Sequence, residues 1–210
     1  MSIGMCSDER QASPLDGLTE AVLACRACQD AGHLLHANPI RPALIDDARM
    51  VLIGQAPGPV TDRKGYHFAG PAGAFLSAWL DRAGFPPGYF REHVYLTSLT
   101  RCFPGKSRSG NGDRAPGRAE MELCRHFLDW ELSALNPRVV LLVGKMAIDA
   151  FVGKRPLVET VGRVFLREER TYVPLPHASG VSRWLNAPEH RVLLEQALTE
   201  LSRLRVELGL

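Results

Sequence analysis

The stretch that decides the fold is Met50–Leu80, which reads MVLIGQAPGPVTDRKGYHFAGPAGAFLSAWL. Its first residues, Met50–Ile53, form an apolar run ended by Gly54, which predicts a short buried strand. The dense glycines and prolines that follow predict an irregular loop in which no helix begins. Beyond it, apolar residues recur at helical spacing and predict a helix over 71–84, with Pro71 in its first turn. Because α/β proteins bind ligands where a strand ends, we expect this long loop to be functional.

The composition is that of one ordinary globular domain. The chain has 210 residues, of which 45% are hydrophobic and 23% charged, with a net charge of +2. This overall charge does not by itself indicate a nucleic-acid partner, so local basic patches must provide that evidence. Because no apolar run reaches the length of a membrane span and the N-terminus lacks a signal-like layout, we expect a cytoplasmic protein without membrane contact. We also expect a monomer. Residues 1–17 are predicted to be a flexible tail and residues 18–210 a single domain.

The rest of the chain alternates between the strand and helix periods. Helices are expected at residues 18–25, 118–135, 145–151 and around 188–204, and further strands at 93–98, 139–143, 163–166 and 172–175. This alternation predicts the α/β class, as a three-layer α/β/α sandwich around a central, mostly parallel sheet of about four strands.

The loop after the first strand carries a recognisable motif. The run GQAPG at Gly54–Gly58 is followed, in order, by Asp62, Gly65, Phe68, Gly70 and Gly73. This ordered set resembles the first motif of the iron–sulfur uracil-DNA glycosylases of the family-4 type, and the resemblance covers roughly residues 18–204. It implies a monofunctional glycosylase of base excision repair, which hydrolyses the bond between uracil, or another deaminated base, and its sugar in DNA and leaves an abasic site.

The cysteines form a second pattern. Cys25 and Cys28 make a Cys-x-x-Cys pair, while Cys102 and Cys124 follow much later in the chain. In a cytoplasmic protein such a set indicates metal binding before disulfides. Four thiolates suit a structural zinc or an iron–sulfur cluster, and four unrelated buried cysteines are the simplest alternative. The family resemblance implies a [4Fe–4S] cluster on these four residues, with Cys6 left as a spare thiol.

A glycine-rich basic loop follows the second predicted strand. Lys106, Arg108, Arg114 and Arg118 lie within it or at its end, and Asp113 is its only acid. A flexible loop of this kind suits contact with DNA phosphates, although most charge runs are simply solvated surface. Some relatives trap DNA covalently through a histidine in this region. Because the loop contains no histidine, we expect no such trapping.

The resemblance also assigns a base pocket. An enzyme that removes a base must swing it out of the duplex, stack it and bind its edge. Phe68 would stack on the base beside Ala56, and His177 would stabilise negative charge on the departing base. Without the resemblance, these two would be an ordinary core aromatic and a surface histidine. The residues after His177 would contact DNA as the base leaves the stack, and these are Ser179, Val181 and Arg183.

Two positions depart from the family pattern. Gln55 stands where the family has a glutamate that positions or activates water. As a catalytic residue, its amide can orient a water but cannot accept its proton. Ser98 stands where the family has an asparagine that recognises uracil. Both changes predict weaker or shifted activity. We therefore expect another carboxylate to act on water, with Asp62 as the first candidate and Asp113 as the second, although Asp62 also suits a plain turn.

Two other functions remain open at the level of sequence. A relative that binds damaged or single-stranded DNA without turnover would explain the changes at Gln55 and Ser98. An unrelated nucleotide-handling enzyme would explain the glycine-rich loop alone. The loop lacks both Gly-x-x-x-x-Gly-Lys-Ser/Thr and Gly-x-Gly-x-x-Gly, however, and that alternative leaves the cysteines unexplained.

Overall fold

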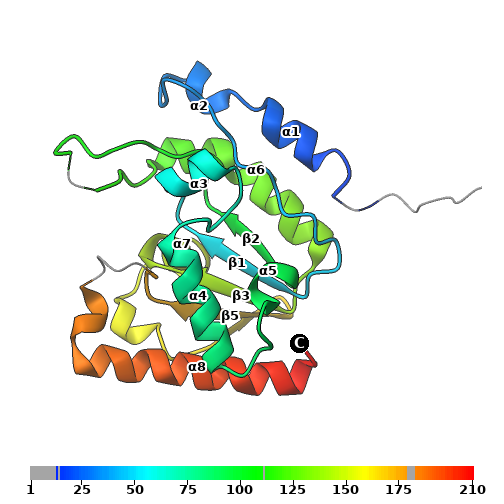
Figure 1. The fold of residues 1–210 in the computed structure, drawn as a ribbon, viewed down its shortest axis with the longest axis vertical. Helices are drawn as coiled ribbons and strands as arrows, with labels where there is room; N and C mark the ends of the chain where they lie inside the picture. Colours follow the sequence, from blue (N-terminus) through cyan, green and yellow to red (C-terminus); the bar gives the residue numbers. More distant parts are fainter. Residues whose placement is uncertain (1–12, 14, 111, 179–182) are drawn as a thin grey trace, which may run out of the picture.

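The computed structural model describes residues 13, 15–110, 112–178 and 183–210 (Figure 1). Within them, one sheet contains β1 (Met50–Gly54), β2 (Val94–Ser98), β3 (Val139–Val143), β4 (Phe165–Arg167) and β5 (Arg170–Leu175), in the order β2-β1-β3-β5-β4. The pairs β1–β2, β1–β3 and β3–β5 are parallel, and only β4 runs antiparallel, at the edge. The mostly parallel sheet is confirmed. It has five strands where about four were expected, and each of the five overlaps a strand segment predicted from the sequence.

Helices cover both faces of this sheet (Figure 1). They are α1 (Leu18–Ala24), α2 (Ala27–Asp30), α3 (Pro59–Lys64), α4 (Pro71–Arg82), α5 (Tyr89–Glu92), α6 (Arg118–Leu135), α7 (Lys145–Phe151) and α8 (Pro188–Leu208), with short 3₁₀ turns at Leu157–Glu159 and Trp184–Asn186. Side chains alternate across each strand, so that Leu52 packs with α4 and α8 while its neighbour Val51 packs with α1, α6 and α7. The predicted three-layer sandwich is therefore confirmed.

The strand order fixes where a ligand can bind. From β1 the chain passes to β2 on one side and then to β3 on the other, so the order reverses at β1. In open α/β sheets the crevice lies outside the carboxyl ends of the strands at such a reversal. Gly54, Ser98, Val143 and Leu175 end the four parallel strands at this edge.

One local expectation was wrong. The loop after β1 does contain a helix, α3, which begins at Pro59 because a proline at the first helical position loses no hydrogen bond there. Most of the predicted tail lies outside the described residues. Leu15, however, is buried in the core beside α1, so the packed structure begins before residue 18.

A charged pair lies inside the layer between the sheet and α6. Arg101 and Glu131 form an ion pair at 2.5 Å, and both side chains are almost fully buried. Tyr95 and Thr97 of β2 donate further hydrogen bonds to the carboxylate, at 2.9 and 2.8 Å. This network joins the end of β2 to α6, because a buried charge is tolerated only when it is paired and hydrogen-bonded.

None of the helices in the described part of the chain is both long enough and apolar enough to cross a membrane.

Candidate active site

A cleft of about 720 Å³ opens at the carboxyl edge of the sheet. Gly54, Ser98 and Val143 supply its floor from the ends of β1, β2 and β3, and His177 enters from the loop after β5. The GQAPG loop and Phe68 form further walls. Four segments that are far apart in the sequence therefore meet at one site, as the strand order requires.

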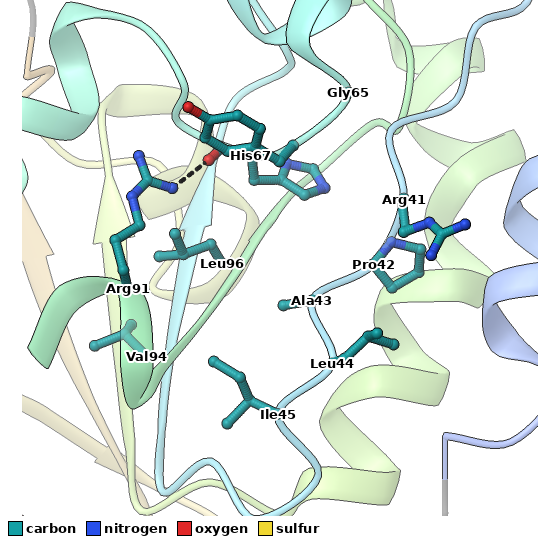
Figure 2. A pocket seen from close by; sticks show the side chains of 11 residues that line it. Arg41, Pro42, Ala43, Leu44, Ile45, Gly65, His67, Arg91, Val94 and Leu96 are labelled. Carbon is teal, nitrogen blue, oxygen red and sulfur yellow. Dashed lines mark hydrogen bonds between the residues drawn. The ribbon is translucent and has the colours of Figure 1, made fainter. Parts of the chain in front are cut away.

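Phe68 is held by its backbone. Its φ angle is +54°, a left-handed conformation that is uncommon for an aromatic residue. Arg91 of α5 donates hydrogen bonds to the carbonyl oxygens of both His67 and Phe68, and Figure 2 shows the first of these, at 2.7 Å. The tip of the Phe68 ring lies against Gly54, where an added Cβ would be only 2.7 Å from Cζ. The ring is therefore fixed at the end of β1, inside the cleft.

Of the residues predicted to act on water, Gln55 lines the cleft and Asp62 does not. Gln55 and its neighbour Ala56 are half-buried in the cleft wall. The Asp62 carboxylate instead accepts a hydrogen bond from the Asn38 amide at 3.0 Å. The second candidate acid, Asp113, does line the cleft.

Ser98 is buried at the floor of the cleft with its hydrogen already engaged. Its hydroxyl donates to the carbonyl oxygen of Thr100 at 2.7 Å. A hydroxyl has one hydrogen but two lone pairs, so Ser98 presents an acceptor to the cleft. The position can therefore accept a hydrogen bond from an N–H group of a ligand.

His177 lines the wall of the cleft from the loop after β5. Desolvation lowers its pKa, which keeps the imidazole neutral at physiological pH. The ring packs over Gly144, where an added Cβ would be 3.3 Å from Cδ2. A neutral imidazole on this wall can donate one hydrogen bond to a ligand without carrying a full charge.

His67 separates the cleft from a second pocket of about 350 Å³, which is bounded by the segment 41–45 and by Arg91, Val94 and Leu96 (Figure 2). Its Nε2 atom is buried and has no hydrogen-bond partner among the described residues. Burial, followed by the charges of Arg101 and Arg91, lowers its pKa to about 3. No spacing in the sequence marked His67 or Arg91, because their roles depend on contacts between separate elements.

The predicted flexible basic loop is instead a short hairpin. Lys106 and Asp113 pair as an antiparallel bridge, and the Arg114 N–H donates to the Gly105 carbonyl at 2.9 Å. The Arg114 guanidinium binds both carboxylate oxygens of Glu120, at 2.6 and 2.8 Å. Glu120 also accepts from the Gly117 N–H at 2.6 Å and so caps α6. Arg114 therefore anchors the hairpin to α6.

The other predicted DNA contacts differ in how far their charges are already paired. Lys106 binds Asp113 at 2.7 Å and Arg118 binds Glu122 at 2.6 Å, both on the surface. Arg108 is exposed and has no ion pair with a described residue. Arg183 is exposed beyond the cleft, whereas Ser179 and Val181 lie outside the described residues.

The four predicted ligand cysteines gather where α1 and α2 pack on α6. Burial is the main cause that raises the pKa of Cys28 to about 11 and that of Cys102 to about 12. The charges of the other cysteines raise both pKa values further, and Cys25 likewise raises that of Cys124. The four thiols therefore lie near enough to one another to interact electrostatically, and no disulfide joins them.

This thiol group fits an iron–sulfur centre in its chemistry. All four donors are cysteine sulfurs, and two of them are half-buried while two are buried. The Arg101 backbone N–H donates to the Cys124 sulfur at 3.4 Å, and the Asn38 backbone bonds to Cys102. N–H groups aimed at sulfur stabilise thiolates and tune such centres. Among the described residues, no three Cys, His, Asp or Glu side chains converge closely enough to hold a single ion.

Several known proteins are similar in sequence to this chain over more than half of its length. A Type-4 uracil-DNA glycosylase from Archaeoglobus fulgidus is 32% identical over 133 residues, which are 63% of this chain and 61% of that protein. One from Thermotoga maritima is 29% identical over 181 residues, 85% of this chain and 88% of that protein. One from Pyrobaculum aerophilum is 30% identical over 114 residues, 54% of this chain and 50% of that protein. The first and third matches span less than two thirds of those relatives.

A family model described as the uracil DNA glycosylase superfamily matches residues 42–200. That range contains the whole sheet, the cleft-lining residues and the hairpin. The predicted resemblance is thus confirmed at the level of the superfamily. The chain belongs to the uracil DNA glycosylase superfamily.

Proposed function

We propose that this protein is a DNA glycosylase of base excision repair, which hydrolyses the N-glycosidic bond of uracil or another deaminated base. One observation carries the proposal: Phe68 and His177 line the same cleft, together with Gln55 and Ser98. An aromatic ring, a neutral imidazole and two polar groups on one concave surface are what a base swung out of DNA requires.

The bond breaks through an oxocarbenium-like state, so stabilising the leaving base can supply much of the rate. Phe68 stacks on the base, with its ring already fixed against Gly54. His177 donates a hydrogen bond to the base oxygen on which negative charge develops. Because the imidazole is neutral, its hydrogen bond to the base strengthens as negative charge grows on the base oxygen. The bond therefore stabilises the transition state more than the bound substrate.

Ser98 sets a limit on specificity. Its engaged hydrogen leaves an acceptor toward the cleft, which suits an N–H group of the base edge. An asparagine amide would provide a donor as well. We therefore expect discrimination between uracil and other deaminated bases to be looser than in relatives with asparagine at this position.

The cysteine group has a structural role in this proposal. Cys25, Cys28, Cys102 and Cys124 would hold a [4Fe–4S] cluster, which supplies cross-links and no step of the hydrolysis. Cys25 and Cys28 belong to the N-terminal helices, whereas Cys102 precedes the hairpin and Cys124 lies in α6. The cluster would join the N-terminal segment to the hairpin that approaches DNA.

The DNA strand would lie across the hairpin side of the cleft. Arg108 is the exposed cation there without an ion pair to a described residue, and Lys106 and Arg118 can exchange their weak surface pairs for phosphates. Arg183 would contact the strand beyond His177. We assign Arg114 to anchoring the hairpin, since Glu120 already neutralises its charge.

Excision from oligonucleotides tests the proposal. We expect the protein to release at least one base from a panel containing uracil, hypoxanthine or xanthine, each as single strand and duplex. We also expect Gln55→Glu to increase uracil release, because it restores a carboxylate beside the base. Binding to these oligonucleotides without release of any base would instead identify a DNA-binding member of the superfamily.

A further inference from the structure

The cleft needs a group that accepts a proton from water, and the hairpin supplies one. Hydrolysis adds the water oxygen to the sugar and releases a proton, and an amide at position 55 cannot take that proton. Of the described residues that line the cleft, Asp113 is the only carboxylate. Asp62, the acid nearest in sequence to the motif, is turned toward Asn38.

The position of Asp113 is fixed by the hairpin on both sides. Its backbone forms the bridge to Lys106, and the next residue, Arg114, is tied to Glu120 and to the Pro104 carbonyl at 3.0 Å. The hairpin belongs to the connection between β2 and α6, which extends from the sheet beside α3 (Figure 1). A residue in the middle of a basic loop is thereby held against the GQAPG motif.

The two carboxylate oxygens of Asp113 have different surroundings. Oδ1 accepts from the Lys106 ammonium at 2.7 Å. Oδ2 faces Gly58, where an added Cβ would lie 3.8 Å from it, and it has no hydrogen-bond partner among the described residues. One oxygen is therefore used to orient the side chain, and the other is available beside the motif.

We infer that Asp113 is the general base of the proposed hydrolysis, acting on a water that the Gln55 carbonyl helps to orient. This inference rests on the proposed glycosylase function. The water oxygen bonds to C1′ of the sugar while the C1′–N bond breaks and its electron pair leaves with the base. Oδ2 of Asp113 takes the water proton, and the released base anion, stabilised by His177, is then protonated by solvent.

Asp113→Asn tests this role because it keeps the shape of the side chain and removes the base. We expect the single-turnover rate, on the panel oligonucleotide that the wild type cleaves fastest, to fall about 100-fold or more, in the range typical of a lost general base. DNA affinity should be unchanged or tighter. The acidic limb of the wild-type pH–rate profile should disappear in the variant, which a structural role alone would not cause.

Two matched variants complete the test. Asp129→Asn removes the carboxylate of an exposed pair with Arg125 on α6, remote from the cleft lining, and should retain wild-type activity within twofold. Lys106→Met removes the hairpin ion pair and should lower the rate less than tenfold.

An active wild type with Asp113→Asn within threefold of it, or with an unchanged acidic limb, would overturn the inference alone. Equal losses in Lys106→Met and Asp113→Asn would overturn it as well, because hairpin geometry would then explain both. A wild type that releases no base from the panel would overturn both the inference and the proposed function.

Discussion

The guanidinium of Arg91 holds the backbone of Phe68 in place by donating hydrogen bonds to the carbonyl oxygens of His67 and Phe68. These two bonds stabilise a left-handed aromatic residue whose conformation by itself costs about 1–3 kcal/mol. The position of Phe68 in the cleft therefore depends on a residue of α5 that does not itself line the cleft.

We expect Arg91→Met to lower the excision rate about tenfold, because Phe68 loses its backbone support and the base its fixed stacking surface. Single-turnover kinetics measure this effect. Arg82→Met is the control, since it removes an exposed arginine paired with Glu195. Equal rates for wild type and Arg91→Met would show that the Phe68 backbone is held by other contacts.

Gly54→Ala should displace the Phe68 ring, because the new Cβ would lie 2.7 Å from Cζ. A ring pushed away from Gly54 loses the position proposed for stacking, so we expect weaker base excision with a nearly unchanged melting temperature. Thermal unfolding and excision assays separate the two effects. An active variant would mean that stacking on Phe68 contributes little to the rate.

The cysteine group leads to a spectroscopic prediction. Anaerobically purified protein should be brown, absorb near 400 nm and contain iron; Cys102→Ser and Cys124→Ser should lose this absorbance and unfold more easily. Cys6→Ser is the matched control and should keep the colour, since Cys6 is outside the predicted ligand set. A colourless wild type with stoichiometric zinc would replace the cluster with a zinc site.

His67 predicts a pH dependence of stability. Its pKa is about 3 in the folded protein and about 6.5 when unfolded, so the unfolded chain binds the extra proton between these values. The contribution of neutral His67 to the free energy of unfolding is therefore present above pH 6.5 and is lost as the pH decreases toward 3. Between pH 7.5 and 5.5 we expect a loss of about 1.4 kcal/mol that His67→Gln lacks, measured by urea unfolding. Parallel losses in both proteins would contradict this assignment.

The buried pair of Arg101 and Glu131 predicts a large effect on stability. Glu131→Gln leaves a buried guanidinium without its counter-charge, which typically costs about 3–5 kcal/mol. Glu207→Gln removes a similar contact with Arg203 on the surface and should cost less than about 1 kcal/mol. Urea unfolding of both variants compares them directly. A small loss for Glu131→Gln would mean that Tyr95 and Thr97 compensate for the missing charge.

Sequence patterns predicted most of the secondary structure because they are local. The apolar run Val139–Val143 and the helical spacing over Arg118–Leu135 gave these two elements with the bounds that the structure shows. The helix α3 was missed because its glycine and proline neighbours outweighed a proline placed where a helix can begin. Family resemblance predicted that Phe68 and His177 would share a pocket, and both line the cleft.

The sequence by itself determined the layered α/β sandwich, the spacing of the four cysteines and the motif that lines the cleft. These features can be read from the sequence because hydrophobic periodicity and motif spacing are properties of consecutive residues. Only the tertiary structure decided which charged side chains are paired with one another and which can contact a ligand in the cleft. It paired Arg114 with Glu120, turned Asp62 toward Asn38 and brought Asp113 to Gly58. Such pairings depend on where separate segments meet in space, and no local pattern in the sequence records that.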